Sequence, residues 1–152
     1  MKTAKILEVC VSDKKGVQKT PVEQIEMRPD WGIEGDAHAG NWHRQMSLLA
    51  QESVERLQQL LTKIRLRPGD FGENIVTEGI VLYELPVGTK MRIGTALAEV
   101  TQIGKECHQG CAIRQAAGDC VMPREGIFVR ILEPGTAKKG DVIELLQDRQ
   151  EA

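Results

Sequence analysis

The stretch KMRIGTALAEVTQ, residues 90–102, decides the fold class of this chain. Its first run, 90–93, alternates polar and apolar side chains, and a second short run, 97–102, follows a turn that contains Gly94. Short runs of this kind, separated by glycine, are typical of β-strands that bury one face. The stretch therefore predicts two successive strands joined by a tight turn.

Runs of the same kind occupy much of the remaining chain. The segment 5–11 alternates, and 22–27 repeats the pattern after the turn-like residues 12–16. We therefore expect these two segments to form an opening hairpin. Further strands are expected at residues 45–49, 73–76, 127–132 and 141–146.

One segment has the periodicity of a helix instead. Val54, Leu57, Leu61 and Ile64 recur at spacings of three, four and three, with Glu, Arg and Gln between them. This is the apolar stripe of an amphipathic helix. The sequence RPGD at 67–70 contains a proline and a glycine, so we expect the helix to have ended there.

Many short strands with one clear helix indicate a mainly β fold with a few helices, built as a β-barrel. The 152 residues fall within the usual size of one domain. We expect a single domain over residues 1–146, followed by a polar C-terminal tail over residues 147–152.

Charge and composition argue against several kinds of partner. The net charge of −2 and the scattered basic residues give no footprint for nucleic acid, and aromatic residues, at 3%, offer few surfaces for base stacking. No apolar run approaches the roughly 20 residues of a membrane-spanning helix. We expect a cytoplasmic protein whose four cysteines are free thiols or ligands rather than disulfides.

The segment 104–126 holds three of those cysteines and is too polar and too interrupted by glycine to be a strand. Loops of this length inside a compact domain are commonly functional. Lys105, His108 and Arg114 carry, or can carry, positive charge. Positive charge near Cys107 favours the thiolate, which is the form that attacks electrophiles or binds soft metals. Cys107 is therefore the candidate reactive thiol.

Two other interpretations of the cysteines stay open. Cys107, His108, Cys111 and Cys120 offer four soft ligands for zinc or an iron–sulfur cluster, although paired C-x2-C motifs are absent. Alternatively, Cys111 and Cys120 are small buried hydrophobic residues. We expect that role for Cys10, which lies in an apolar strand pattern, and we expect it to be the least reactive cysteine.

A second cluster of polar side chains lies in and after the glycine-rich loop 28–41. Asp36, His38 and His43 can form a hydrogen-bonded acid–base group or part of a metal site. Asp36 and His38 share one face if the segment is extended. Because Asp and His also commonly satisfy the backbone of turns, a structural role is the alternative.

Two further expectations concern loops. Glu73 and Asn74 follow the GDFG turn at 69–72, where they either cap the turn or contact a ligand. The loops 28–41 and 104–126 are both long, polar and rich in glycine. We expect them to lie side by side at one mouth of the barrel, where binding residues are commonly presented.

Five sequence blocks follow one another in order along the chain: GIEGDAHAG (32–40), RQMSLL (44–49), RPGDFGENI (67–75), LPVGT (85–89) and GKEC (104–107). Together they resemble the MOSC domains, and the resemblance extends from about Leu7 to Leu146. This family occurs at the C-terminus of molybdenum cofactor sulfurases, in amidoxime-reducing components and as short stand-alone bacterial proteins, the type that this chain resembles.

The resemblance implies a β-barrel that binds the molybdenum cofactor, an anionic pterin. It also implies that Cys107 is the functional cysteine, as a ligand to molybdenum or as a sulfur carrier. Residues expected to contact the cofactor are Asp36, His38, Arg44, Asn74 and Lys105. Pyridoxal phosphate is not expected, because no lysine lies in a distinctive Schiff-base setting.

Different functions fit this site. In the first, the protein is an enzyme that reduces N-hydroxylated substrates at a molybdenum held by Cys107. In the second, it is a sulfur carrier with a Cys107 persulfide, or a module that handles the cofactor without turnover of its own. A structural zinc module is the third. Expected partners are the small-molecule cofactor and substrate, together with molybdopterin-handling proteins or an electron donor.

Overall fold

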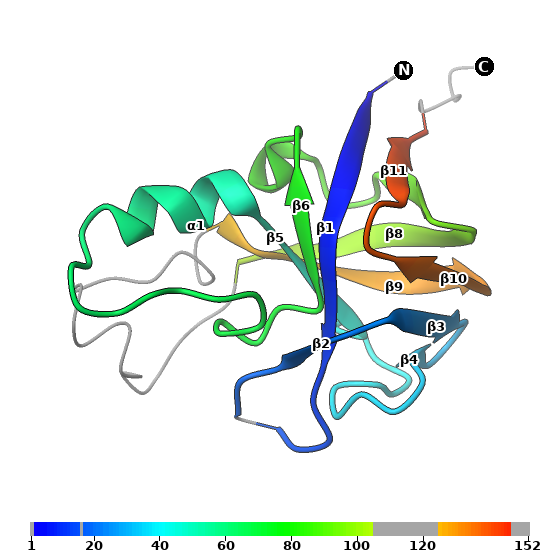
Figure 1. Cartoon of the computed structure of the whole chain (residues 1–152). Coiled ribbons are helices and arrows are strands. Elements are labelled where there is room, and N and C mark those ends of the chain that lie inside the picture. The colour runs from blue at the N-terminus through cyan, green and yellow to red at the C-terminus, as the bar shows by residue number, and fades with distance from the viewer. Residues whose placement is uncertain (1, 16, 105–124, 147–152) are drawn as a thin grey trace.

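The computed structural model describes residues 2–15, 17–104 and 125–146 of the chain (Figure 1). Within these residues the chain forms strands, one α-helix and one short 3-10 helix. The elements in chain order are β1 (Thr3–Val11), β2 (Thr20–Val22), β3 (Gln24–Arg28), β4 (Gly32–Ile33), β5 (Met46–Ala50), α1 (Gln51–Gln58), β6 (Ile75–Glu78), η1 (Leu82–Glu84), β7 (Lys90–Ile93), β8 (Ala96–Ile103), β9 (Ile127–Glu133), β10 (Gly135–Lys138) and β11 (Val142–Leu145).

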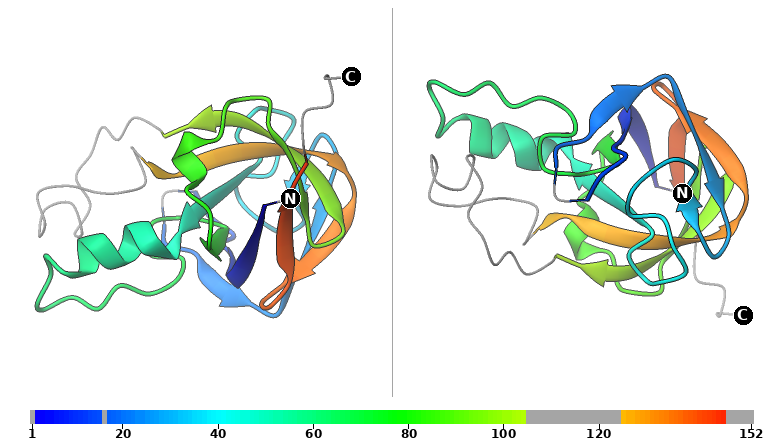
Figure 2. Two further views of the ribbon diagram at one scale, coloured as in Figure 1. Left: turned by 90° about the horizontal axis from the view of Figure 1, so that it is seen from above. Right: turned by 90° about the horizontal axis from the view of Figure 1, so that it is seen from below.

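Seven of the described strands close into a barrel, in the order β1, β11, β7, β8, β9, β5 and β6, with β6 returning to β1. The closing pair is antiparallel and places Ala4 opposite Ile143. Closure leaves the wall of the barrel without an open edge for other chains to pair with. Figure 2 shows the ring of strands from above and from below. The mainly β prediction is confirmed.

Aliphatic side chains and methionines fill the barrel interior. Met46, Met91, Ile93 and Val129 come from three different strands, and each is fully buried in one cluster. A small barrel has just enough interior room for side chains of this kind, so the interior is a packed core rather than a ligand cavity. A binding site must therefore lie on the outside or at an end of the barrel.

A second sheet, ordered β10, β3 and β4, packs against the barrel strands β1, β8 and β9. Its central strand β3 buries Ile25 and Met27 in the barrel core while the residues between and beside them stay exposed. This period of two is the alternation expected for a sheet with one covered face. In Figure 2, the view from below shows β3 and β4 in front of the barrel end.

The helix α1 connects β5 to β6, the one parallel pair among the described strand pairings. Parallel neighbours need a crossover, and here α1 provides it outside the barrel wall. Strand β5 is buried along its whole length because it is covered on both faces. Leu48 points into the barrel core, and Leu49 packs in a separate cluster with Val54 and Leu57 of α1.

The expected helix is too long by about two turns. It ends at Gln58, and the chain then turns back, so that Leu61 is buried and Ile64 is partly buried in the cluster beneath α1. The Gln58 side chain fixes this return, because its amide donates to the carbonyl of Ile64 and accepts from the N–H of Leu66. The apolar spacing therefore predicted correctly which side chains are buried, but it did not predict where the helix ends.

The opening hairpin is also only partly correct. β1 pairs with β2 through Val9 and Val22, but the segment from Gln24 onward leaves this pairing and joins the second sheet. The predicted strand at 22–27 thus spans two elements that belong to two sheets. The loop expected at 28–41 begins later, because Arg28 and Gly32 still pair as strand residues.

Candidate functional site

The candidate site lies where β5 begins, β8 ends and β9 begins. We call this place the rim and define it by His43, Arg44, Gln102 and Phe128. The segment 105–124 leaves the described chain after Gly104 and returns at Glu125. The two ends are held together, since the N–H of Gly104 donates to the carbonyl of Gly126 at 2.7 Å. Cys107 therefore belongs to a segment that starts and finishes at the rim.

Arg44 is held in a defined orientation at the rim. Its Nε donates to Oε1 of Gln102 at 3.1 Å, and its guanidinium carbon lies 5.3 Å from the centre of the Phe128 ring. The amide of Gln102 is itself oriented, because its nitrogen donates to the carbonyl of Gly104. The terminal nitrogens of Arg44 make no hydrogen bond with the residues that the structure describes. They remain available to bind an anion, to which a guanidinium donates strong hydrogen bonds.

His43 shares the same acceptor as Arg44. Its Nε2 lies 2.9 Å from Oε1 of Gln102. Since an amide oxygen can only accept, the imidazole nitrogen is the donor in this contact. The expected acid–base group of Asp36, His38 and His43 is not formed as a unit, because His43 is bound to the rim instead.

Asp36 and His38 come together around a buried lysine. The Nζ of Lys19 lies 2.8 Å from Oδ1 of Asp36, 3.1 Å from Nδ1 of His38 and 3.1 Å from Oγ of Ser12. We call these four residues the lysine cluster. The side chains of Lys19 and Asp36 are 1% and 0% exposed, so the ion pair is fully buried.

The carboxylate of Asp36 also organises the surrounding backbone. Its Oδ1 accepts from the N–H of Ser12 and its Oδ2 from the N–H of His38, each at 3.1 Å. Asp36 thus serves the turn, as the structural alternative expected, and at the same time neutralises Lys19. Its contacts join the end of β1 to the loop that carries His38.

Trp42 lies between the lysine cluster and the rim. Its indole N–H donates to the carbonyl of His38 at 2.8 Å, and its ring is parallel to that of His38 within 3°, with centroids 6.5 Å apart. The Trp42 ring also meets the His43 ring edge to face, with the centroids 5.9 Å apart. The ammonium of Lys15 lies 5.6 Å from the ring centroid. A continuous basic and aromatic surface therefore runs from His38 to Arg44.

Asn74 lies within the fold. It is 1% exposed, its Oδ1 accepts from the N–H of Ser47 at 3.0 Å, and its amide nitrogen donates to the carbonyl of Cys10 at 3.0 Å. These bonds tie β5 and β1 to the residue that precedes β6. The structure gives Asn74 a bridging position below the site rather than one on its surface.

Glu73 caps the turn before β6. Its two carboxylate oxygens accept from the N–H groups of Gly69 and Phe71, each at 3.0 Å. Burial raises the pKa of Glu73 from 4.5 to about 7. Gly69 adopts a φ of +90° and lies close to the backbone of Lys19. A Cβ atom added to Gly69 would lie 2.0 Å from the carbonyl oxygen of Lys19. The turn capped by Glu73 therefore supports the backbone of the lysine cluster.

Cys10 is buried on β1, and this burial raises the pKa of its thiol from 9.0 to about 12. Cys107 and Lys105 lie outside the described residues, as do the other cysteines and His108 of the zinc hypothesis. Over the ranges 2–15, 17–104 and 125–146, no group of three or more His, Cys, Asp or Glu side chains is placed to hold a metal ion.

Sequence reasoning missed Lys19 and Gln102. Lys19 lies 17 residues before Asp36, and Gln102 lies 58 residues after Arg44, so neither contact leaves a local pattern. The residues next to Lys19 form no local pattern that distinguishes a buried lysine from an exposed one.

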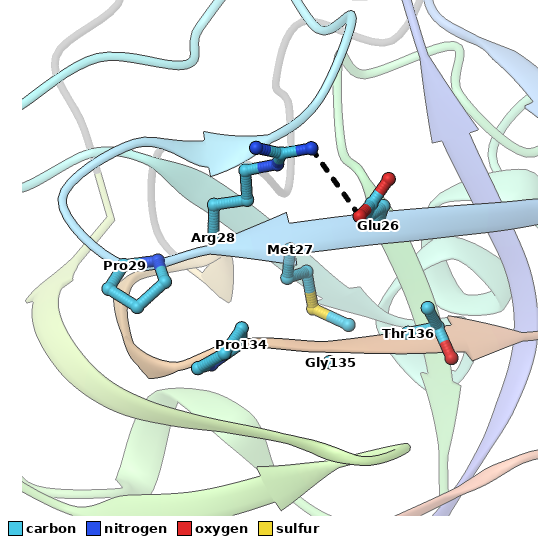
Figure 3. A pocket seen from close by; sticks show the side chains of 7 residues that line it. All are labelled: Glu26, Met27, Arg28, Pro29, Pro134, Gly135 and Thr136. Atoms are coloured by element: carbon cyan, nitrogen blue, oxygen red, sulfur yellow. Dashed lines mark ion pairs between the residues drawn. The ribbon is translucent and has the colours of Figure 1, made fainter.

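One hollow on the described surface lies away from the rim. It has a volume of about 680 Å³ between the end of β3 and the start of β10, and residues 26–29 and 134–136 line it (Figure 3). Its charged groups satisfy each other, since Arg28 pairs with Glu26 at 3.5 Å and with Glu34 at 3.1 Å. The lining contains no histidine or cysteine, so we place the candidate site at the rim and the lysine cluster.

None of the helices that the structure describes is long and apolar enough to cross a membrane.

Solved structures confirm the fold. YuaD from Bacillus subtilis is 20% identical with a TM-score of 0.78, covering 94% of this chain and 95% of that one. YiiM from Geobacillus stearothermophilus is 19% identical, with a TM-score of 0.67 and coverage of 95% and 75%. YiiM from Escherichia coli is 18% identical, with a TM-score of 0.65 and coverage of 97% and 70%.

No curated protein matches the sequence. The family model of the MOSC domain matches residues 35–144, which is more than half of the chain. The matched range includes both His38 and the three strands that meet at the rim. This chain belongs to the MOSC domain family.

Proposed function

We propose that the protein binds the molybdenum cofactor at the rim and the lysine cluster, with the Cys107 thiolate as its ligand to molybdenum, and reduces N-hydroxylated substrates there. Membership of the MOSC family supports the cofactor. The observation that carries the proposal is the fixed orientation of Arg44. It lies at the rim, where the residues that flank the segment 105–124, which contains Cys107, are hydrogen-bonded to each other.

The donors at the rim fit an anionic cofactor. Gln102 and Phe128 hold the Arg44 guanidinium in place, and its terminal nitrogens make no hydrogen bond to the described residues. The nearby Lys15 adds a further positive charge above Trp42. A hydrogen bond from such a cation to an anion contributes about 1.5–3 kcal/mol, and a planar guanidinium can donate two in parallel.

The proposed reaction assigns different tasks to these residues. Arg44 binds and orients the anionic part of the cofactor, and the lysine cluster holds His38 beside it. When bound, the cofactor supplies a metal centre that takes part in electron transfer. The reduction breaks the N–O bond of the substrate, takes up two electrons and two protons, and releases water and the parent compound that carries N–H in place of N–OH. The electrons come from a separate redox partner.

Molybdenum retention tests the proposal. The wild type and the variants Cys107→Ser and Arg44→Ala are produced in a host that makes the cofactor, and bound molybdenum is measured by mass spectrometry. Cys107→Ser should abolish retention, whereas Arg44→Ala should weaken it about 10- to 100-fold, as expected for the loss of a charged hydrogen bond.

Arg130→Ala is the matched control, because Arg130 lies on β9 and pairs with Glu99 on the outer face of the barrel. It should retain molybdenum as the wild type does. Thermal melts show first that all variants fold. Wild-type retention in Cys107→Ser would overturn the proposal. A wild type that holds cyanide-labile sulfur but no molybdenum would identify the protein as a sulfur carrier instead.

Activity is measured on the same samples, with a reduced viologen dye as electron donor and a simple N-hydroxylated amidine as substrate. The wild type should turn over and Cys107→Ser should not. Stoichiometric molybdenum without turnover would restrict the function to holding the cofactor.

A further inference from the structure

Lys19 is a buried cation that makes three contacts at the end of its side chain. An ammonium group has three hydrogens and no lone pair, so it can only donate. The three hydrogens of Lys19 meet three acceptors: Oδ1 of Asp36, Oγ of Ser12 and Nδ1 of His38. The Ser12 hydroxyl can accept because its own hydrogen is donated to the carbonyl of Lys14 at 2.9 Å.

The direction of the hydrogen bond between Lys19 and His38 determines which nitrogen of His38 carries the hydrogen. Because Lys19 donates at 3.1 Å, Nδ1 of His38 must carry a lone pair. In a neutral imidazole the hydrogen is then on Nε2. The opposite tautomer would point an N–H at an ammonium, and it would also leave one hydrogen of a buried cation without an acceptor, which costs free energy.

The His38 ring is also held from other directions. The backbone N–H of His38 donates to Asp36, its carbonyl accepts from the indole of Trp42, and the two rings lie parallel. Turning the ring over would bring the carbon Cδ2 to the place of Nδ1 and would leave Lys19 without this acceptor. Position and tautomer are set together.

We infer that Lys19 is a positioning residue that locks His38 in the Nε2–H tautomer, so that any hydrogen bond of Nε2 is one that it donates. This deepens the proposed function, on which the role toward a bound cofactor or substrate rests. A donor suits an oxygen of the anionic cofactor or of the substrate. The same tautomer excludes two other roles for Nδ1, general base and metal ligand, because that lone pair is already engaged.

Nitrogen NMR on protein labelled with 15N-histidine tests the inference directly. The chain has three histidines, and comparison with His38→Gln assigns the His38 signals. At neutral pH the wild type should show a pyridine-type signal for Nδ1 and a pyrrole-type signal for Nε2. A pyrrole-type Nδ1, or two pyrrole-type signals from a doubly protonated ring, would overturn the inference without any variant.

Variants of Lys19 then test its part. Lys19→Arg remains a pure donor and should retain the Nε2–H species. Lys19→Met removes the donor and leaves the Asp36 carboxylate alone beside the ring, so the single Nε2–H species should be lost. The His43 signals serve as the internal control and should not move, since that ring is bound to Gln102. An unchanged His38 spectrum in folded Lys19→Met would refute the role of Lys19.

The spectra are recorded on cofactor-free protein, so they do not depend on molybdenum. A correct tautomer with no molybdenum retention would overturn the proposed function alone. Molybdenum retention with the wrong tautomer would overturn this inference alone.

Discussion

Replacing Asp36 with asparagine should destabilise the protein strongly. The change keeps the shape of the side chain and one carbonyl oxygen, so packing and the acceptor for Ser12 can remain. It removes the negative charge 2.8 Å from the ammonium of Lys19, whose side chain is 1% exposed. Breaking a buried ion pair by removing one partner costs about 3–5 kcal/mol, because the remaining charge is left uncompensated in the interior.

The retained carbonyl places the expected loss for Asp36→Asn near the lower end, about 3 kcal/mol. Natural domains have a free energy of unfolding of about 5–15 kcal/mol, so this is a large fraction of the total. For a chain of this size, the same loss lowers the melting temperature by about 6–12 °C.

Glu34 provides the matched control two residues earlier in the same loop. It also forms an ion pair, with Arg28 at 3.1 Å, but its side chain is 52% exposed. Exposed pairs contribute about 0–1 kcal/mol, so Glu34→Gln should change the free energy of unfolding by no more than about 1 kcal/mol. The two variants therefore separate the effect of burial from the effect of charge.

Urea unfolding, followed by the fluorescence of Trp31 and Trp42, measures both variants. The midpoint should fall for Asp36→Asn with an unchanged slope, because the surface exposed on unfolding stays the same. If Asp36→Asn and Glu34→Gln lost the same free energy, the buried ion pair would not exist in solution. The assignment of Lys19 as a positioning residue would then fail as well.

Two further predictions concern buried acids and thiols. Because the pKa of Glu73 rises from 4.5 in the unfolded chain to about 7 in the fold, the folded state binds the proton more tightly. This contribution to stability is complete below pH 4.5 and is lost as the pH rises to about 7, on the order of 3 kcal/mol. Urea titrations should show that fall in the wild type and a flatter profile in Glu73→Gln; an equal fall in both would contradict it. In alkylation with peptide mapping, Cys107 should be labelled first and Cys10 last, since burial raises the pKa of the Cys10 thiol to about 12. Labelling of Cys10 ahead of Cys107 in the folded protein would reject Cys107 as the working thiol.

Local patterns predicted most strands because a strand with one covered face alternates buried apolar and exposed polar residues, and this alternation is visible in the sequence. The run 90–93 matches β7, and Ile127–Glu133 differs from the predicted strand by one residue. Two strands, β4 and β10, were not predicted, and both were missed for the same reason. β4 has two residues and β10 contains glycine and threonine, so neither provides enough alternation to be recognised.

The candidate site was predictable in part. Arg44, Asp36 and His38 were expected from their sequence blocks. The structure connects His38 to the rim through Trp42 and His43, and it buries Asp36 beneath His38 in the ion pair with Lys19. Asn74 came from the same blocks, but its hydrogen bonds join strands. A match to a sequence block does not distinguish a residue that stabilises the fold from one that contacts a ligand.

The sequence by itself determined that this chain is mainly β, because apolar spacing and turn residues act over a few positions and are readable there. Its resemblance to the MOSC domains came from the five sequence blocks. Only the tertiary structure decided that β3 leaves the opening hairpin for a second sheet, that the barrel closes between β1 and β11, and that Lys19 is buried against Asp36 and His38. These features depend on contacts between distant segments. Desolvation and hydrogen-bond direction arise only when such segments meet, so no local pattern encodes them.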